Sequence, residues 1–183
     1  MTTSLLLLCF LGLQGAFIWA RYTVFRIDGP TPPGARVVEV STVLCIGVGM
    51  GLIASRSAAQ AVACASAFMF SWAVRSVRRW QLSAAFSKDM PAELLRSGAF
   101  GFVRNPFYSA YLLAHAVPLV GTRSLWALVP LACMAMLYRR AVAVEERKFL
   151  DSPLAAEWQQ YARDTGRFLP RLPLRRKQRE SLT

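Results

Sequence analysis

Long apolar runs, separated by short polar segments, occupy most of the first 140 residues of the chain. An α-helix rises ~1.5 Å per residue, so about 20 apolar residues cross the ~30 Å hydrocarbon core of a bilayer. The pattern therefore predicts an all-α fold, an integral membrane helical bundle of about five transmembrane helices. The predicted spans cover residues 4–22, 37–54, 57–74, 106–121 and 125–140.

The first run has no basic residue before Arg21, so it lacks the basic start of a signal peptide, and we interpret it as a retained span. Prolines and glycines make residues 26–34 a loop. A short helix is expected at residues 91–96. The fifth helix should continue over residues 141–150, and an amphipathic helix should follow from Pro153 to about Arg163. The whole chain, 1–183, is predicted to be a single domain.

The two C-terminal spans are joined by the short segment from Gly121 to Ser124, which predicts an antiparallel hairpin. Pro118 and Pro130 fall within these spans and are expected to kink them, since proline removes a helical hydrogen bond. In a bundle, neighbouring helices can satisfy the carbonyls that such a kink frees.

Positive charge is distributed unevenly along the chain, whose formal net charge is +12. With five spans and the N-terminus outside, every cation except Arg56 and Arg123 falls on the inner side. Residues 75–105 and 141–173 are then cytoplasmic. We expect a protein of a bacterial inner membrane, with anionic lipids as partners of its basic face and no nucleic-acid partner.

Residue types that bind metals are sparse. Cys9, Cys45, Cys64 and Cys133 lie in four different apolar runs without a Cys-x-x-Cys pair, and we interpret them as small buried hydrophobic residues. His115 is the single histidine, which excludes a multi-histidine site, and no metal is predicted. The triplet Gly47-x-Gly49-x-Gly51 has no strand before it and is interpreted as a helix-packing surface rather than a nucleotide loop.

The polar segment before the fourth span combines glycines, a cation and a helix start. Gly98 and Gly101 permit backbone angles that other residues avoid. Asn105 has a side chain suited to capping a helix, and Pro106 suits the first turn. With Arg104 beside them, these residues indicate a site for a small anionic or zwitterionic ligand at a membrane edge.

A second polar block follows the fifth span. It contains Glu145-Glu146, then Trp158-x-x-Tyr161, then Arg167-Phe168-Leu169-Pro170. Adjacent helical residues point about 100° apart, so at most one of the two acids need face a site. Surface pairing of Glu145 with Lys148 is an equally simple interpretation, as are a lipid-anchoring role for Arg104 and an interfacial belt of tyrosines.

Together the two blocks, over residues 75–173, resemble the isoprenylcysteine carboxyl methyltransferase and phospholipid methyltransferase superfamily. Its motif is Gly-x-Tyr-x-x-x-Arg-His-Pro-x-Tyr-x-Gly, with Asn a familiar substitute for His. Phe100 stands in place of the first Tyr and Ala110 in place of the last Gly. The matching residues are Gly98, Arg104, Asn105, Pro106 and Tyr108.

The resemblance implies a membrane methyltransferase that uses S-adenosyl-L-methionine, with the paired acids at the cofactor and Arg104 at its carboxylate. Arg167 and Arg171 suit the same anion or lipid headgroups. The predicted catalytic residues are Arg104, Asn105 and Glu146. The predicted cofactor-binding residues are Gly98, Arg104, Asn105, Pro106, Tyr108, Glu145, Glu146, Tyr161 and Arg171.

The Asn105 side chain cannot titrate, so its role would be hydrogen bonding. This fits methyl transfer, because the sulfonium is an activated donor and the protein mainly needs to align it with the acceptor. If the acceptor needs a base, Glu39, Glu145 and Glu146 are the candidates. The acceptor is expected to be a lipophilic small molecule or lipid that carries a carboxylate, phenol, amine or thiol. Two alternatives stay open: an NADPH-dependent enzyme resembling the sterol reductases, and a membrane scaffold without catalytic activity.

Overall fold

The computed structural model describes residues 12, 15–17, 19, 25–26, 57–77, 82–83, 93–123 and 125–171. This part of the chain is mostly helical, as predicted, with two strands of two residues each. The elements are β1 (Phe25–Arg26), α3 (Ser57–Val77), β2 (Leu82–Ser83), α4 (Ala99–Phe102), α5 (Pro106–Thr122), η1 (Leu125–Ala127), α6 (Leu128–Leu150) and α7 (Ala155–Asp164). Of the first predicted span only a few helical positions are described, and the second span lies outside the described residues.

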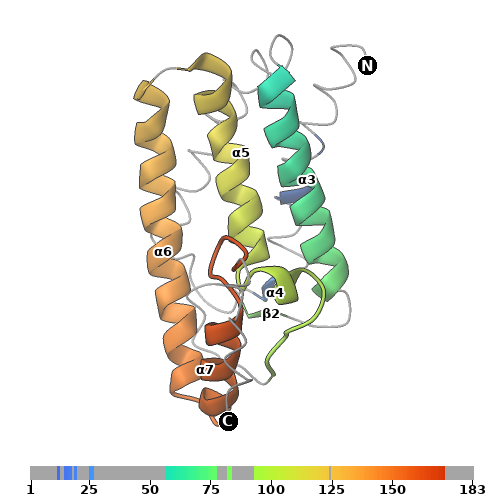
Figure 1. Ribbon diagram of the computed structural model, residues 1–183, viewed down its shortest axis with the longest axis vertical. Helices are drawn as coiled ribbons and strands as arrows, with labels where there is room; N and C mark the ends of the chain where they lie inside the picture. The colour runs from blue at the N-terminus through green and yellow to red at the C-terminus, as the bar shows by residue number, and fades with distance from the viewer. Residues whose placement is uncertain are drawn as a thin grey trace, which may run out of the picture.

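Three long helices, α3, α5 and α6, lie side by side, with α5 between the other two (Figure 1). Small residues allow α3 and α5 to approach closely: Ala59, Ala63 and Ala73 are fully or almost fully buried. Ser66, also buried, donates a hydrogen bond from its hydroxyl to the Ala110 carbonyl oxygen at 2.8 Å. Aromatic side chains fill the rest of this interface around Phe70, whose ring centroid lies 5.7 Å from that of Phe107.

The predicted helix boundaries are largely confirmed for the hairpin of α5 and α6. Pro106 occupies the first turn of α5, and the helix ends at Arg123, which adopts a left-handed conformation with φ 55°. Pro118 lies inside α5, whereas Pro130 falls in the first turn of α6, where the lack of an N–H costs little. The helix expected at residues 91–96 is wrong, because described residues 93–96 are not helical and the short helix is α4.

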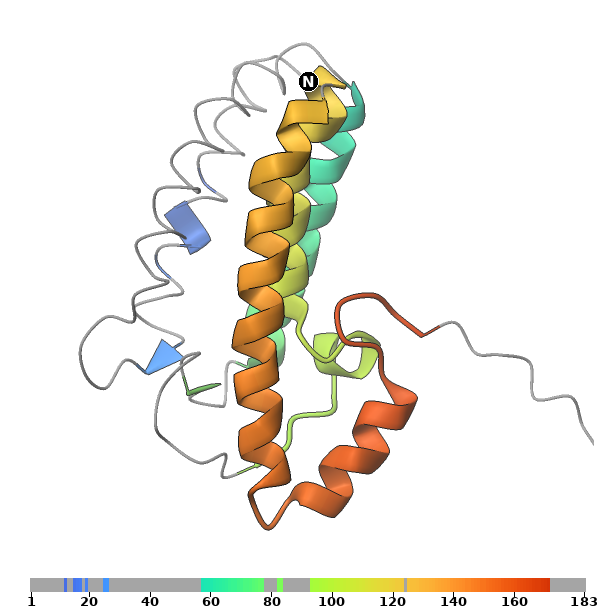
Figure 2. The ribbon, with the colours of Figure 1, turned by 90° about the vertical axis from the view of Figure 1, so that its left-hand side faces the viewer.

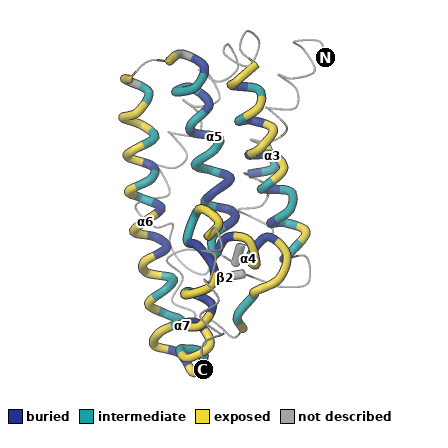
Figure 3. Tube along the Cα trace, in the orientation of Figure 1, coloured by how far each residue is buried: buried dark blue, intermediate teal, exposed yellow. Residues whose placement is uncertain are grey.

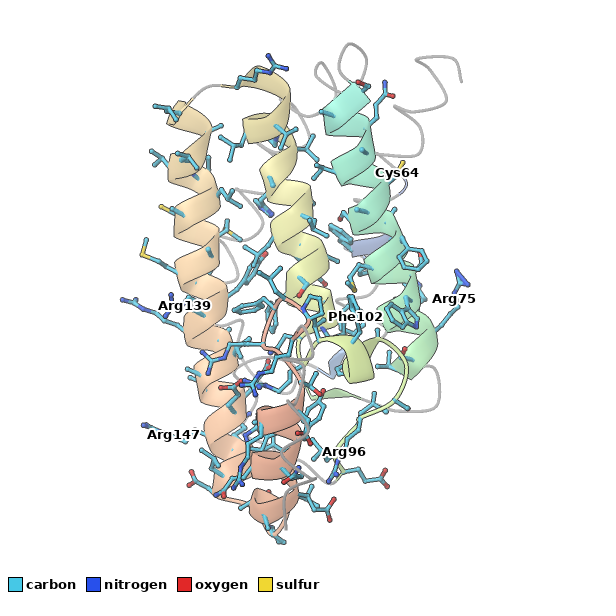
Figure 4. The ribbon with its side chains drawn as sticks, in the orientation of Figure 1. Cys64, Arg75, Arg96, Phe102, Arg139 and Arg147 are labelled. Atoms are coloured by element: carbon cyan, nitrogen blue, oxygen red, sulfur yellow. The ribbon has the colours of Figure 1, made fainter. Side chains whose placement is uncertain are left out.

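Both α3 and α6 carry exposed positions over much of their length (Figure 3), and many of these positions are large apolar side chains. Phe68 on α3 is 69% exposed, and Met136 on α6 is 57% exposed. Arg75 of α3 and Arg139 of α6 point outward at a similar level in Figure 4. By length and composition, α3 alone among the described helices could cross a membrane, and its 57–75 segment is ~27 Å long.

The cysteine prediction is wrong at two positions. Cys64 and Cys133 are free and exposed on the outer faces of α3 and α6 rather than buried. Sequence hydrophobicity alone does not distinguish a residue that faces the bundle from one that faces outward along the same helix. Cys9 and Cys45 lie outside the described residues.

Two short segments that were not predicted to be strands pair with each other. Strand β1 runs parallel to β2, with Phe25 opposite Leu82 and Arg26 opposite Ser83. Figure 2 shows this pair at the end of the bundle where α4 and α7 also lie, whereas the turn between α5 and α6 lies at the opposite end. The pairing therefore brings residues 25–26 and 82–83 together at one end of the molecule.

Candidate functional site

The loop before α5 is fixed against the end of α3 by a glycine. Gly98 has φ +60°, and a Cβ there would lie 2.3 Å from the Ser76 hydroxyl oxygen. That hydroxyl accepts a hydrogen bond from the Ala99 amide at 3.0 Å. Gly101 was predicted to adopt backbone angles that other residues avoid, but it lies within α4 and has no positive φ. A Cβ there would approach the Arg96 carbonyl oxygen to 3.0 Å.

The two polar blocks that are far apart in sequence meet through their backbones. Val103 forms a parallel bridge with Gly166, and the Arg104 amide donates to the Gly166 carbonyl oxygen at 2.8 Å. Asn105 follows, with its amide 3.2 Å and its side-chain Nδ2 3.1 Å from the Arg167 carbonyl oxygen. Asn105 is the N-cap residue of α5, but its side chain does not cap the helix as predicted, because it binds this carbonyl instead.

Residues 165–171, here called the strap, turn back over the start of α5 (Figure 2). A Cβ at Gly166 would lie only 1.9 Å from the Leu169 carbonyl oxygen, so only glycine fits this turn. The Ser109 hydroxyl donates to the Phe168 carbonyl oxygen at 2.8 Å. The strap is thus attached to α5 as well as to the loop before it.

Arg104 joins three parts of the site. Its Nη1 donates to the carbonyl oxygens of Ala162 at 2.7 Å and Thr165 at 2.6 Å, at the C-terminal end of α7. Cations are favoured there because the last carbonyls of a helix lack helical partners. Its Nη2 donates to Glu146 Oε1 at 3.0 Å, and the guanidinium lies 5.6 Å from the Trp158 ring centroid. Arg104 Nε is buried without a hydrogen-bond partner among the described residues.

Glu146 is held between two guanidinium groups. Besides Arg104, it binds Arg167, whose Nε donates to Oε1 at 3.1 Å and whose Nη2 pairs with Oε2. The side chains of Arg104 and Glu146 are 8% and 13% exposed, whereas that of Arg167 is 39% exposed. We call this group of Arg104, Glu146 and Arg167 the clamp.

Glu145 faces a different neighbour. Its Oε1 accepts a hydrogen bond from the Tyr108 hydroxyl of α5 at 2.9 Å. Burial raises the pKa of the Glu145 carboxyl to about 7, against the lowering effects of the Tyr108 hydrogen bond and of Lys148. Both acids therefore point inward, which sequence reasoning did not require: their ~100° separation aims one at α5 and the other at the clamp.

Helix α7 docks through the Trp158-x-x-Tyr161 motif. The Trp158 ring stacks on Phe149 of α6, with centroids 4.6 Å apart. The Tyr161 hydroxyl donates to the Phe100 carbonyl oxygen at 2.6 Å, and burial raises the pKa of that hydroxyl. In the site as described, Tyr161 therefore fixes α7 to α4.

The comparisons with known proteins bear on what this site is. A family model described as phospholipid methyltransferase matches residues 61–156, just over half of the chain. The chain belongs to the phospholipid methyltransferase family. No curated protein and no solved structure matches it.

For this member of the phospholipid methyltransferase family, the structure brings most of the predicted site residues together. The exception is Arg171, which is exposed at the end of the strap. The residues gathered around the clamp are Arg104, Asn105, Pro106, Tyr108, Glu145, Glu146 and Tyr161, with Gly98 fixing the loop that carries them. Among the described residues, no group of histidine, cysteine and acidic side chains could hold a metal ion.

Sequence reasoning missed three residues that build the site, Ser76, Ser109 and Gly166. It also gave a fourth, Arg167, less weight than the structure does. Ser76 and Ser109 carry no distinguishing signal, because isolated serines are common in helices. Gly166 could have been noticed as a glycine directly before the Arg167-Phe168-Leu169-Pro170 segment. Arg167 was considered only beside Arg171, but it is Arg167 that reaches the acids.

Proposed function

We propose that this protein is an integral membrane methyltransferase that transfers the methyl group of S-adenosyl-L-methionine to a lipophilic acceptor. The observation that carries the proposal is the meeting of residues 98–108 with residues 145–167 through Glu146. Membership of a methyltransferase family supports methyl transfer over the reductase and scaffold alternatives.

The clamp suits a zwitterionic cofactor. Arg104 Nε is a buried donor without a partner among the described residues, and the Arg167 guanidinium is partly exposed, so both suit a carboxylate. Glu146 suits an ammonium or a cationic sulfonium. The cofactor, when bound, supplies a methyl group that is already activated on sulfur. The protein's own residues then bind it, orient it and keep it beside the bundle.

A lipophilic acceptor fits the surroundings of this site. The outer faces of α3 and α6 expose Phe68, Val129 and Met136 up to the level of Arg75 and Arg139. Such faces suit contact with lipid chains, with the arginines at the interface. The clamp is at the end of the bundle beyond that level, where a water-soluble cofactor and a membrane-bound acceptor can meet.

Cofactor protection tests the proposal directly. The purified protein in detergent is heated with S-adenosyl-L-methionine, with S-adenosylhomocysteine or with NADPH. A ligand at about a hundred times its Kd adds ~2.7 kcal/mol of stability, so the first two should raise Tm and NADPH should not. The variant Arg167→Gln should weaken this protection, whereas Arg163→Gln, at an exposed position of α7, should not. If NADPH alone protects the protein, the methyltransferase proposal is wrong and the reductase alternative is favoured.

Methyl transfer is then measured on membranes that contain the protein. They are incubated with methyl-labelled S-adenosyl-L-methionine, and the lipid extract is separated to identify the labelled product. Label should appear in the extract with the wild-type protein and be absent from membranes without it. If cofactor protection occurs but no label enters any extracted compound, the proposed acceptor class is wrong.

The proposed orientation has its own experiment. Single cysteines are introduced by Arg123→Cys in the α5–α6 turn and by Gln159→Cys in α7, after the four native cysteines have been replaced. In intact cells a membrane-impermeant maleimide should label the first position and not the second. The reverse labelling would place the clamp on the outside.

A further inference from the structure

The two adjacent acids of α6, Glu145 and Glu146, have different hydrogen-bond partners and therefore suit different chemical roles. Glu146 contacts two guanidinium groups, which leave both of its carboxylate oxygens engaged. Glu145 has no guanidinium partner among the described residues, and its Oε1 accepts a hydrogen bond from the Tyr108 hydroxyl. Pairs of carboxyl groups with such contrasting environments commonly divide the electrostatic and proton-transfer roles of a site.

Glu145 lies at one end of a line of polar side chains between α5 and α6. Centroids of the Tyr108 and Tyr138 rings are 5.1 Å apart, and those of Tyr111 and Tyr138 are 6.0 Å apart. At the other end, His115 lies 6.5 Å from Tyr138. We call Tyr108, Tyr111, His115, Tyr138 and Glu145 the polar seam.

The polar seam has a feature that points to a ligand. His115 is 7% exposed, its Nδ1 lies 2.8 Å from the Tyr111 carbonyl oxygen, and its Nε2 is buried without a partner among the described residues. A buried polar nitrogen without a partner is costly, and polar side chains inside an apolar bundle usually serve substrates or protons. The seam leads from this nitrogen to the Glu145 carboxylate.

We infer that the polar seam receives the reactive group of the acceptor and that Glu145, through the Tyr108 hydroxyl, takes the proton this group loses on methylation. The acceptor is therefore a protic one, with an N–H or O–H bond to break, rather than a carboxylate already ionised in the membrane. The inference rests on the proposed methyltransferase function. It assigns Glu145 to the acceptor, whereas the sequence predicted that Glu145 binds the cofactor.

The step balances without another reactant. The carbon–sulfur bond of the sulfonium breaks, and a carbon–nitrogen or carbon–oxygen bond forms, so the sulfonium becomes a neutral thioether. The acceptor proton passes to the Tyr108 oxygen while the Tyr108 proton passes to Glu145, which becomes a neutral carboxylic acid. Loss of that proton to water restores the carboxylate.

The pH dependence has a defined sign. Glu145 must be ionised to accept a proton, and burial raises the pKa of its carboxyl to about 7, so the rate should fall as the pH drops below about 7. The groups that act on it are Tyr108 from α5 and, on its own helix, Lys148 and Glu146. A base with a pKa near the working pH is well suited to proton transfer.

The matched variants Glu145→Gln and Glu146→Gln test the division of roles, since they differ only in which of two neighbouring carboxylates is neutralised. Each is assayed for cofactor protection against heat and for label transferred to the membrane lipid extract between pH 5.5 and 9. The synthetic acceptors are phosphatidylethanolamine vesicles, which offer an amine, and a long-chain hydroquinone, which offers a phenol. Tyr108→Phe is a second probe of the same proton route.

Glu145→Gln should keep cofactor protection, lower the transfer rate by about 100-fold or more and lose the acidic limb of the pH profile. Tyr108→Phe should show the same pattern, and Glu146→Gln should lose cofactor protection. Wild-type rate and pH profile in Glu145→Gln would overturn the inference, and so would loss of cofactor protection in that variant. If the wild-type protein neither gains cofactor protection nor transfers label, the proposed function fails instead.

Discussion

The bundle and the clamp adjoin each other at α5 and α6, because Glu146 lies on α6 and Arg104 directly precedes α5, but they are held together by different forces. In the bundle, alanines, Ser66 and aromatic rings in tilted and edge-to-face contact bring α3 and α5 close together. At the clamp, the contacts are hydrogen bonds from guanidinium groups to carboxylate and backbone carbonyl oxygens. Packing thus sets how the helices lie, and charged hydrogen bonds set how α7 and the strap close over their ends (Figure 2).

This contrast has a practical consequence. Substitutions that change side-chain volume should lower the stability of the bundle and leave cofactor affinity intact in molecules that fold. Substitutions that remove a charge should act mainly on the clamp and on ligand binding. Four variants, one in the bundle and three at the clamp or beside it, put this separation to the test.

The largest effect is expected from Glu146→Ala. It leaves the Arg104 guanidinium, 8% exposed, without its carboxylate partner and also frees Arg167. Breaking a buried ion pair from one side typically costs about 3–5 kcal/mol. The free energy of unfolding in detergent, measured by titration with denaturing detergent, should fall by that amount, and cofactor protection should disappear. Unchanged stability would mean that the clamp does not hold α7.

A smaller loss is expected from Phe70→Ala in the bundle. The Phe70 side chain is 3% exposed and packs against Phe17 and Phe107. Such truncations usually cost about 3–5 kcal/mol, but lipid competes for apolar surface in a membrane, so we expect about 2–3 kcal/mol. The Kd for S-adenosyl-L-methionine should stay within about twofold of the wild-type value. A tenfold change in that Kd would show that the two regions are coupled.

Tyr161→Phe removes one hydrogen bond between α7 and α4. The Tyr161 hydroxyl donates to the Phe100 carbonyl oxygen at 2.6 Å, and its loss should cost about 1 kcal/mol. Backbone hydrogen exchange of residues 99–102 and 155–164 should accelerate, while exchange in α3 stays as in the wild type. Equal acceleration throughout α3 would contradict the assignment of Tyr161 to the clamp end alone.

The smallest effect is expected from Arg96→Gln. Arg96 pairs with Glu157, but their side chains are 40% and 61% exposed. Ion pairs of this kind contribute less than about 1 kcal/mol, and high salt weakens them further. Stability and methyl transfer should both remain close to the wild-type values, which makes this variant a control for the charge changes at Glu146.

The sequence predicted the long helices well because apolar runs report length and approximate ends. It predicted less about contacts that depend on helix termini. Arg104 was expected to bind a ligand carboxylate, yet its Nη1 binds the last carbonyls of α7, which hydrophobic periodicity does not reveal. The expected helix at 91–96 failed for a related reason: the glycine at position 98, with its positive φ, places the helix after it.

The partners of Arg104 on α7 and the strap have a consequence for biosynthesis. Residues 162–167 are translated after all three long helices, so during translation the bundle helices can enter the membrane while Arg104 still awaits its carbonyl acceptors. A chain truncated before Thr165 would contain all three long helices but would lack the carbonyl acceptors that close the site around Arg104. Production of active enzyme is therefore decided late, by a few residues far from the helices they complete.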